Sequence, residues 1–121
     1  MPGDAPKRVV LVEDSEDIRE LMAELLREAG HEVTTTCSGP EGFAKIVAEQ
    51  PDVAFVDIGL PGFDGFEVAR RVRASGSAVR LVALSGYGQS ADRARAHAAG
   101  FDEHLTKPAG LEQIERAIMA A

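Results

Sequence analysis

The chain has 121 residues, enough for one domain to bury a hydrophobic core without disulfides or a structural metal ion. Hydrophobic residues make up 45% of it and charged residues 27%, which is typical of globular proteins and excludes a disordered chain. The net charge of −7 argues against direct nucleic-acid binding, which needs a clustered basic face. Because no apolar run is long enough to span a membrane and no signal-peptide pattern opens the chain, we expect a cytoplasmic protein without a membrane partner.

Strand and helix patterns alternate from the start of the chain. Residues 1–8, with two prolines and a glycine, are expected to form a flexible lead-in to a domain at 9–121. An apolar strand at 8–12 stops abruptly at the acidic stretch 13–17. Gly30 is placed to end the helix that follows. The inner face of that helix is predicted from apolar residues spaced three and four apart, namely Ile18, Leu21, Met22, Leu25, Leu26 and Ala29.

The next strand and helix are more polar at their boundaries. Residues 31–36 are β-branched but polar, as expected of an edge strand. Ser38, Pro40 and Glu41 then combine a helix-capping serine, a proline in the first turn and an acid three residues after the serine. Pro51 is expected to close this helix. The remaining predicted elements are strands at 53–56, 80–84 and 104–106, and helices at 65–73, about 91–99 (capped by Ser90 and stopped by Gly100) and 111–118.

This alternation predicts an α/β fold. Strands separated by helices of this length form right-handed crossovers and a parallel sheet covered on both faces. The three most apolar strands should be central, with the strands at 33–36 and 104–106 at the edges. We therefore predict a doubly wound (βα)5 fold, flavodoxin-like, with a five-stranded parallel sheet in strand order 2-1-3-4-5.

Polar residues stand where the predicted strands end. They are Glu13 and Asp14 after the first strand, Asp57 after the third, Ser85 after the fourth and Lys107 after the fifth. Ligands of such sheets bind beyond the carboxyl ends of the strands, so these side chains should share one crevice. Carboxylates brought close together either take up protons or hold a cation. Mg²⁺ fits best, because it prefers oxygen ligands and is commonly held by one or two carboxylates plus a phosphoryl oxygen; Mn²⁺ would be able to substitute.

A cation beside a carboxylate, a lysine and a hydroxyl is typical of a phosphoryl-transfer site. Asp57 would supply the attacking oxygen. Asp14 would bind the ion directly, and Glu13 directly or through water. Lys107 would neutralise the phosphoryl oxygens, and Ser85 would donate a hydrogen bond to one of them.

Two glycines complete the predicted site, and simpler interpretations stay open. Gly59 and Gly86 leave room for backbone groups to approach the ion and the phosphoryl group. Asp57 could instead only start the turn that follows it, and the acidic pair after the first strand could only cap the first helix. Lys107 could be a solvated surface lysine, and Ser85 could only open a turn. His31 and His97 are expected on the surface rather than as ligands.

Taken together, these features resemble the receiver domains of two-component response regulators. The resemblance covers Val9 to Ile118, and its motifs are Glu13-Asp14, Asp57 within Val-Asp-Ile-Gly-Leu-Pro-Gly-Phe-Asp-Gly, Ser85 and Lys107-Pro108. It implies that Asp57 is the phosphoacceptor and that the backbone carbonyl of Gly59 is a further Mg²⁺ ligand. It also implies a cis bond before Pro108. One departure is His104, which stands where the family often carries the Tyr or Phe that moves together with Ser85; we expect coupling at His104 to be weaker or pH-sensitive.

The resemblance implies a signalling switch rather than an enzyme with a turnover substrate. A sensor histidine kinase or histidine phosphotransfer protein would pass a phosphoryl group from its phosphohistidine to Asp57, which would later lose it to water. The face formed by the fourth helix, fifth strand and fifth helix would then change for a downstream protein target. The stretches at 84–88, 99–102 and 107–108 are most similar to receivers attached to hybrid sensor kinases, and a stand-alone regulator is the alternative.

Other functions remain as alternatives. One is a receiver-like interaction domain that is never phosphorylated. A Mg²⁺-dependent phosphatase is a weaker alternative, because such enzymes typically need a second acid two residues after the nucleophile, where this chain has Gly59. A flavin-binding module of the same topology is disfavoured because Glu13 and Asp14 would repel a phosphate.

Overall fold

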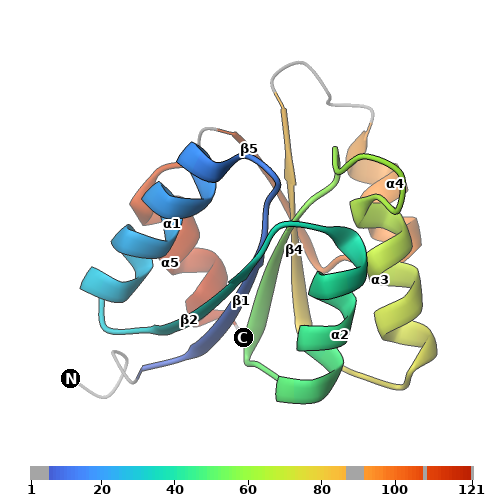
Figure 1. Ribbon diagram of the computed structural model, residues 1–121, viewed down its shortest axis with the longest axis horizontal. Helices are drawn as coiled ribbons and strands as arrows, with labels where there is room; N and C mark the ends of the chain where they lie inside the picture. The colour runs from blue at the N-terminus through green and yellow to red at the C-terminus, as the bar shows by residue number, and fades with distance from the viewer. Residues whose placement is uncertain (1–5, 87–91, 108, 121) are drawn as a thin grey trace.

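A parallel sheet lies between two layers of helices in the computed structural model, which describes residues 6–86, 92–107 and 109–120 (Figure 1). The described strands form one sheet in the order β2-β1-β3-β4-β5, with every neighbouring pair parallel. The predicted flavodoxin-like fold and strand order are confirmed, including the edge positions of β2 and β5. The elements are β1 (Arg8–Val12), α1 (Glu16–Glu28), β2 (Glu32–Thr36), α2 (Gly39–Glu49), β3 (Val53–Asp57), α3 (Gly65–Ala74), β4 (Arg80–Ser85), α4 (Asp92–Ala99), β5 (Glu103–Thr106) and α5 (Leu111–Met119).

The helices begin and end where local sequence signals place them. Ser15, Ser38 and Asp64 each accept a hydrogen bond from the backbone N–H three residues on, which satisfies an otherwise unpaired donor at the start of α1, α2 and α3. Gly30 follows α1 with a φ of 99°, a conformation that only glycine adopts readily. The predicted cap Ser90 lies outside the described residues. No helix in the described part of the chain combines the length and the apolar character that a membrane crossing needs, and the cytoplasmic location stays a prediction.

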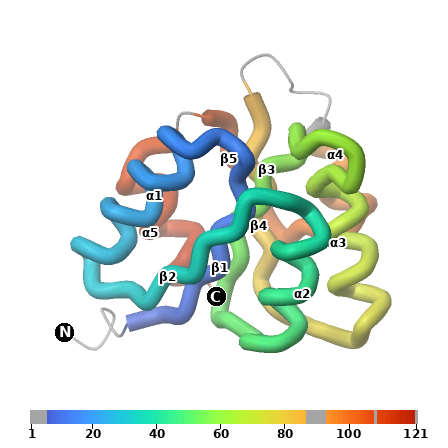
Figure 2. The backbone as a smooth tube through the Cα atoms, in the orientation of Figure 1, coloured from blue at the N-terminus to red at the C-terminus, as the bar shows by residue number. Residues whose placement is uncertain are grey.

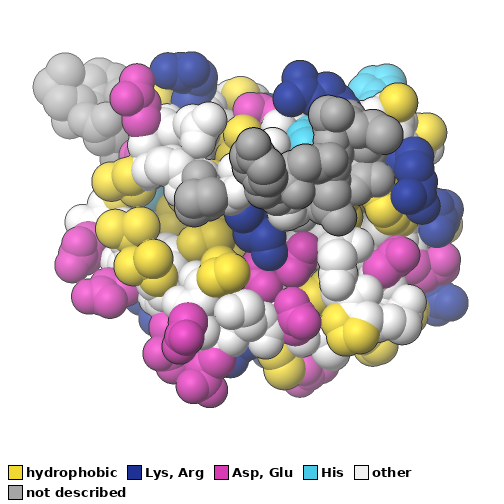
Figure 3. Space-filling model, turned by 90° about the horizontal axis from the view of Figure 1, so that it is seen from above, with side chains coloured by type: hydrophobic (Ala, Val, Ile, Leu, Met, Phe, Trp, Pro, Cys, Tyr) yellow, Lys and Arg dark blue, Asp and Glu magenta, His cyan; other side chains and the backbone are white. Residues whose placement is uncertain are grey.

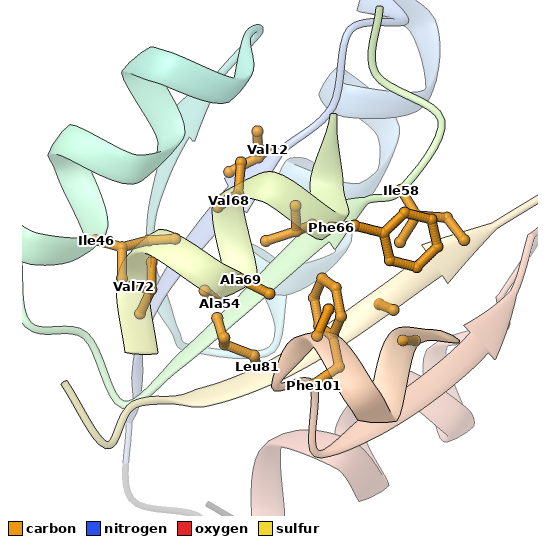
Figure 4. Packing of buried hydrophobic residues seen from close by; sticks show 14 of the residues in the cluster. Val12, Ile46, Ala54, Ile58, Phe66, Val68, Ala69, Val72, Leu81 and Phe101 are labelled. Atoms are coloured by element: carbon orange, nitrogen blue, oxygen red, sulfur yellow. The ribbon is translucent and has the colours of Figure 1, made fainter. Parts of the chain in front are cut away.

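Hydrophobic side chains fill the space on each side of the sheet. Because side chains alternate along a strand, Val9 and Leu11 of β1 face α1 and α5, while Val10 and Val12 face α2 and α3. Each fully buried aliphatic side chain contributes about 1.5–3 kcal/mol through removal from water. Figure 4 shows the packing on the α2–α3–α4 side, where labelled residues from strands and helices meet: Val12, Ile46, Ala54, Ile58, Phe66, Val68, Ala69, Val72, Leu81 and Phe101.

Three expectations about individual residues were wrong. Leu21 is 59% exposed and Ala29 is exposed as well, because the apolar stripe of α1 is wider than the strip that contacts the sheet. His31, expected on the surface, is buried between two elements: its Nδ1 accepts a hydrogen bond from the backbone N–H of Lys7, and its Nε2 lies 2.9 Å from Oε1 of Glu115 on α5. The predicted flexible lead-in falls largely on residues 1–5, outside the described part of the chain.

Candidate functional site

The predicted site residues lie at one edge of the sheet. β1 and β3 are paired up to Val12 and Val56, and the pairing of β4 with β5 runs to Ser85 and Thr106, so four strands end side by side. In Figure 2 the connections that leave β1 and β3 rise to the same end of the molecule, where β4 also ends. This common edge brings together side chains that are up to 94 positions apart in the sequence, such as Glu13 and Lys107.

Three carboxylates meet at this edge. Glu13, Asp14 and Asp57 each offer one oxygen, and these oxygens lie within 4.8 Å of one another. Glu13 and Asp57 are buried, while Asp14 is exposed, so the cluster faces solvent on one side. Figure 3 looks onto this end of the molecule and shows acidic side chains gathered beside a basic one near its centre. All the ligand atoms are hard oxygens within reach of one small ion, so the residues fit Mg²⁺.

Lys107 lies between two of the three carboxylates. Its Nζ donates to Oε1 of Glu13 at 3.1 Å and to Oδ2 of Asp57 at 3.2 Å, and its side chain is 19% exposed. Three carboxylates and one ammonium group leave two negative charges when all are ionised. The ammonium group of Lys107 thus neutralises only one of the three carboxylates, and a divalent cation would neutralise the remaining charge.

Burial changes the protonation of this cluster. It raises the pKa of Glu13 from 4.5 to about 7; the negative charge of Asp57 adds to the rise, while the N–H of Ser15 and the ammonium of Lys107 oppose it. For Lys107, burial alone lowers the pKa, but the carboxylates of Asp57 and Glu13 outweigh it and raise the pKa above 10.5. The lysine therefore stays charged at neutral pH, while the buried glutamate is partly protonated when no metal ion is bound.

The turn after β3 orients the carboxylate of Asp57. The N–H of Gly59 donates to Oδ1 of Asp57 at 2.8 Å, and the N–H of Ile58 donates to the carbonyl of Leu84 at 2.9 Å. Asp57 therefore starts the turn and also lies within the acidic cluster, so the two interpretations of its role are compatible. A carboxylate held by a backbone N–H on one oxygen and a lysine on the other has a defined orientation.

Ser85 contacts His104 rather than the carboxylates. Its Oγ lies 2.7 Å from Nε2 of His104, and Ser85 is buried at the end of β4. The backbone N–H of Lys107 donates to the carbonyl of Ser85 at 2.7 Å, which ties the fifth strand end to the fourth. The serine and the histidine that the sequence singled out as a moving pair are therefore in direct contact. Gly86 follows at the end of the described segment, and the predicted cis bond before Pro108 lies outside the described residues.

Arg19 supports the site but was not identified from the sequence. Its Nη1 donates to the carbonyl of Glu13 at 2.9 Å and to that of Asp14 at 3.4 Å, so the guanidinium holds the acidic turn from α1. An arginine in the first turns of a helix is common, and no local pattern distinguishes this one. Only the fold places its side chain under the turn.

Comparison with known proteins identifies the family. The family model described as "Response regulator receiver domain" matches residues 9–119. The chain belongs to this family. Among solved structures, this receiver domain is similar to the chemotaxis protein CheY4 of Vibrio cholerae, with a TM-score of 0.86, 28% identity, and coverage of 96% of this chain and 98% of that one.

Several curated relatives of the receiver domain are named as regulators. Protein PilG of Pseudomonas aeruginosa is 31% identical over 115 residues, which are 93% of this chain and 85% of that protein. The transcriptional regulatory protein TcrA of Mycobacterium tuberculosis is 35% identical over 107 residues, which are 88% of this chain but 42% of TcrA. The receiver domain thus spans less than half the length of several regulators that it matches.

Proposed function

We propose that this receiver domain is a phosphoacceptor switch that takes a phosphoryl group from a partner's phosphohistidine onto Asp57. The partner would be a sensor histidine kinase or a histidine phosphotransfer protein. The observation that carries the proposal is the cluster of three carboxylates within 4.8 Å, two of them bridged by Lys107, at the carboxyl edge of a receiver fold. The domain that acts in this way corresponds to residues 9–121.

Mg²⁺ is the cofactor that this donor set fits, with Mn²⁺ as a substitute. Glu13, Asp14 and Asp57 would supply carboxylate oxygens, and the carbonyl of Gly59 would supply a fourth ligand. When bound, the ion neutralises negative charge on the carboxylates and on the incoming phosphoryl group. Asp14 is the exposed member of the set, so its carboxylate is accessible to an ion that arrives from solvent.

The transfer itself needs one bond formed and one bond broken. A carboxylate oxygen of Asp57 forms a bond to phosphorus while the bond between phosphorus and the donor's histidine nitrogen breaks, and that nitrogen keeps the electron pair. Lys107 already donates to Asp57, and its raised pKa keeps it charged, so it can follow the negative charge onto the phosphoryl oxygens. Ser85 and Gly86 would donate further hydrogen bonds to those oxygens. Later attack by water on phosphorus would break the bond to the oxygen of Asp57, release inorganic phosphate and return the carboxylate. The domain would thus promote both its own phosphorylation and its own dephosphorylation.

The effect of phosphorylation would be transmitted to the rest of the molecule through Ser85. Its hydroxyl contacts His104 in the present state, so donating to a phosphoryl oxygen requires a new arrangement of this pair. His104 lies on β5, and a change there would alter the face made by α4, β5 and α5, where a downstream protein would bind. The pair Ser85–His104 is thus the proposed switch.

The test is the intact mass of the protein after incubation with acetyl phosphate and Mg²⁺. We expect a gain of one phosphoryl group in the wild type and none in Asp57→Asn or in a chelated sample. Asp64→Asn is the matched control: it lies in the same loop and caps α3, and asparagine caps a helix as well as aspartate does, so its gain should equal that of the wild type.

Other outcomes would contradict the proposal in distinguishable ways. A gain that persists in Asp57→Asn would place the acceptor elsewhere. If neither acetyl phosphate nor a phosphorylated histidine phosphotransfer protein modifies the wild type, the chain is a receiver-like interaction domain that is not phosphorylated. Steady hydrolysis of an added phosphate ester would instead indicate a phosphatase.

A further inference from the structure

The loop that carries Gly59 is held firmly at its start. Ile58 and Leu60 are 4% and 3% exposed and belong to the core on the α2–α3–α4 side, while Gly59 between them is exposed. The N–H of Gly59 holds Oδ1 of Asp57. Any displacement of this loop therefore moves the proposed metal-binding carbonyl and changes the orientation of the Asp57 carboxylate.

The far end of the loop rests on α2. Phe63 is partly buried, and the guanidinium of Arg71 lies 4.6 Å from its ring centroid. The backbone carbonyl and the ring of Phe63 pack directly against the α-carbon of Gly39, the first residue of α2. A β-carbon at position 39 would lie well inside 3.0 Å of both groups. Gly39 is buried and does not have a positive φ, so the reason for glycine here is the close approach of Phe63 and not backbone conformation.

A second close approach closes the loop on itself. A β-carbon at Gly65, the first residue of α3, would lie 2.5 Å from the carbonyl oxygen of Asp57. The segment between Asp57 and α3 is thus confined by Gly65 from its own helix and by Gly39 from a neighbouring helix. Figure 1 shows α2 and α3 side by side on the same face of the sheet. Since backbone atoms make both contacts, little adjustment is available to either.

We propose that Gly39 is a positioning residue for the metal-binding loop: its bare α-carbon lets Phe63 dock on α2, and this docking sets where the carbonyl of Gly59 lies. The inference rests on the proposed function, because it assigns that carbonyl to the ion. Gly39 itself touches neither the acidic cluster nor the phosphoryl position. It acts only through Phe63 and the loop.

The test compares Gly39→Ala with Gly42→Ala. Gly42 is also buried on α2, and a β-carbon there would lie 2.5 Å from a methyl group of Val12 on β1, away from the loop. Both variants therefore add one methyl group to the same helix at a tightly packed position. They differ in what the methyl group meets: the loop through Phe63, or the side chain of a core valine.

Two measurements on the full chain separate the outcomes. Amide NMR spectra without metal should show displaced signals for residues 57–64 in Gly39→Ala and not in Gly42→Ala. A Mg²⁺ titration followed by the same spectra should show a half-saturating concentration about tenfold or more above the wild type in Gly39→Ala, the usual effect of losing a group that orients a metal ligand. Gly42→Ala should titrate as the wild type does. Phe63→Leu, which removes the ring from Gly39 and keeps an apolar side chain, should weaken Mg²⁺ binding too and serves if Gly39→Ala does not fold.

Each contrary result has a distinct meaning. If Gly39→Ala and Phe63→Leu both bind Mg²⁺ as well as the wild type does, the positioning role is wrong and the proposed function stands. If Gly39→Ala does not fold, the same conclusion follows from Phe63→Leu alone. An equal loss in Gly39→Ala and Gly42→Ala would also overturn the role, because a general disturbance of α2 would explain it. If the wild type itself binds no Mg²⁺, the metal-dependent function fails and the inference fails with it.

Discussion

Replacing Glu13 by glutamine should stabilise the metal-free protein at neutral and alkaline pH. Glutamine has nearly the same shape, and its side-chain carbonyl can still accept from Lys107, which now donates to Oε1 of Glu13 at 3.1 Å. Its amide nitrogen takes the place of Oε2, which now accepts from the N–H of Ser15 at 3.1 Å, so that hydrogen bond is lost at a cost of about 1 kcal/mol at every pH. The substitution also removes a carboxylate that is fully buried beside the carboxylate of Asp57. The pH-dependent part of the change therefore isolates the effect of one buried negative charge.

The pKa of Glu13 sets the size and the pH range of the effect. Its pKa rises from 4.5 in the unfolded chain to about 7 in the fold, so the folded protein holds this proton more tightly. That contribution to stability is complete below about pH 4.5 and is lost as the pH rises through 7. A pKa difference of this size corresponds to about 3 kcal/mol. The stability of Glu13→Gln relative to the wild type should therefore rise by about 3 kcal/mol between pH 4 and pH 8, from about 1 kcal/mol below the wild type to about 2 kcal/mol above it.

Because the chain has no tryptophan whose fluorescence could report unfolding, urea unfolding is followed by far-UV circular dichroism. At an m-value of about 2 kcal/mol per molar urea, the midpoint of Glu13→Gln at pH 8 should lie about 1 M above that of the wild type. Asp14→Asn is the matched control, because it removes an exposed carboxylate of the same cluster and should change stability by no more than about 0.5 kcal/mol.

Mg²⁺ should reduce the advantage of Glu13→Gln over the wild type. The wild type gains about 2.7 kcal/mol when the ion is present at a hundred times its dissociation constant, and Glu13→Gln gains less because one ligand has lost its charge. The reasoning is refuted if Glu13→Gln is less stable than the wild type at pH 8 without metal. It is equally refuted if the difference between the two proteins is the same at pH 4 and at pH 8.

Three further substitutions test other parts of the structure. Lys107→Met leaves two buried carboxylates facing each other and should lower the metal-free stability at pH 8 by about 3 kcal/mol in the same urea assay, a loss that should be smaller near pH 4, where Glu13 is protonated; a loss that does not change with pH would contradict this. His104→Phe, measured by NMR with the phosphoryl mimic beryllofluoride at pH 6 and pH 8, should remove the pH dependence of the shifts on β5, and wild-type shifts that are equal at both pH values would rule out a pH-sensitive switch. The guanidinium of Arg73 donates to the carbonyls of Ser77, Val79 and Gly100 and to the carboxylate of Asp102. Arg73→Gln should therefore lower the free energy of unfolding by about 3 kcal/mol in a thermal unfolding experiment, and a loss below about 1 kcal/mol would show that these hydrogen bonds are dispensable.

The sheet order and the location of the site were predictable because both follow from short patterns. The strand at 53–56 is apolar on both faces and therefore central, whereas Thr34 and Thr35 of β2 are polar enough for an edge. Once the strands are parallel, the residues that follow them must meet at one edge. This is why Glu13 and Lys107 could be placed together despite their separation in the sequence.

Contacts between distant elements were not predictable in the same way. The burial of His31 depends on its contact with Glu115 on α5, and no sequence pattern around residue 31 predicts that contact. The exposure of Leu21 depends on how α1 rolls on the sheet, which the spacing of apolar residues leaves free within one turn. Gly39 reads as an ordinary residue at the start of a helix until Phe63 is found against it. Such features arise from three-dimensional packing, and local sequence carries little trace of them.

The choice of glutamate at position 13 runs against stability and so points to binding. The side chain is fully buried, glutamine could keep the hydrogen bond from Lys107 but not the one from Ser15, and the charge of the glutamate costs about 3 kcal/mol above pH 7. An uncharged residue would therefore make a more stable metal-free fold. A carboxylate is the better residue only when a cation is present to neutralise it, because the charge then becomes a source of affinity. The destabilised metal-free site and the proposed Mg²⁺ site are thus two consequences of one buried charge, which Lys107 contacts together with Asp57.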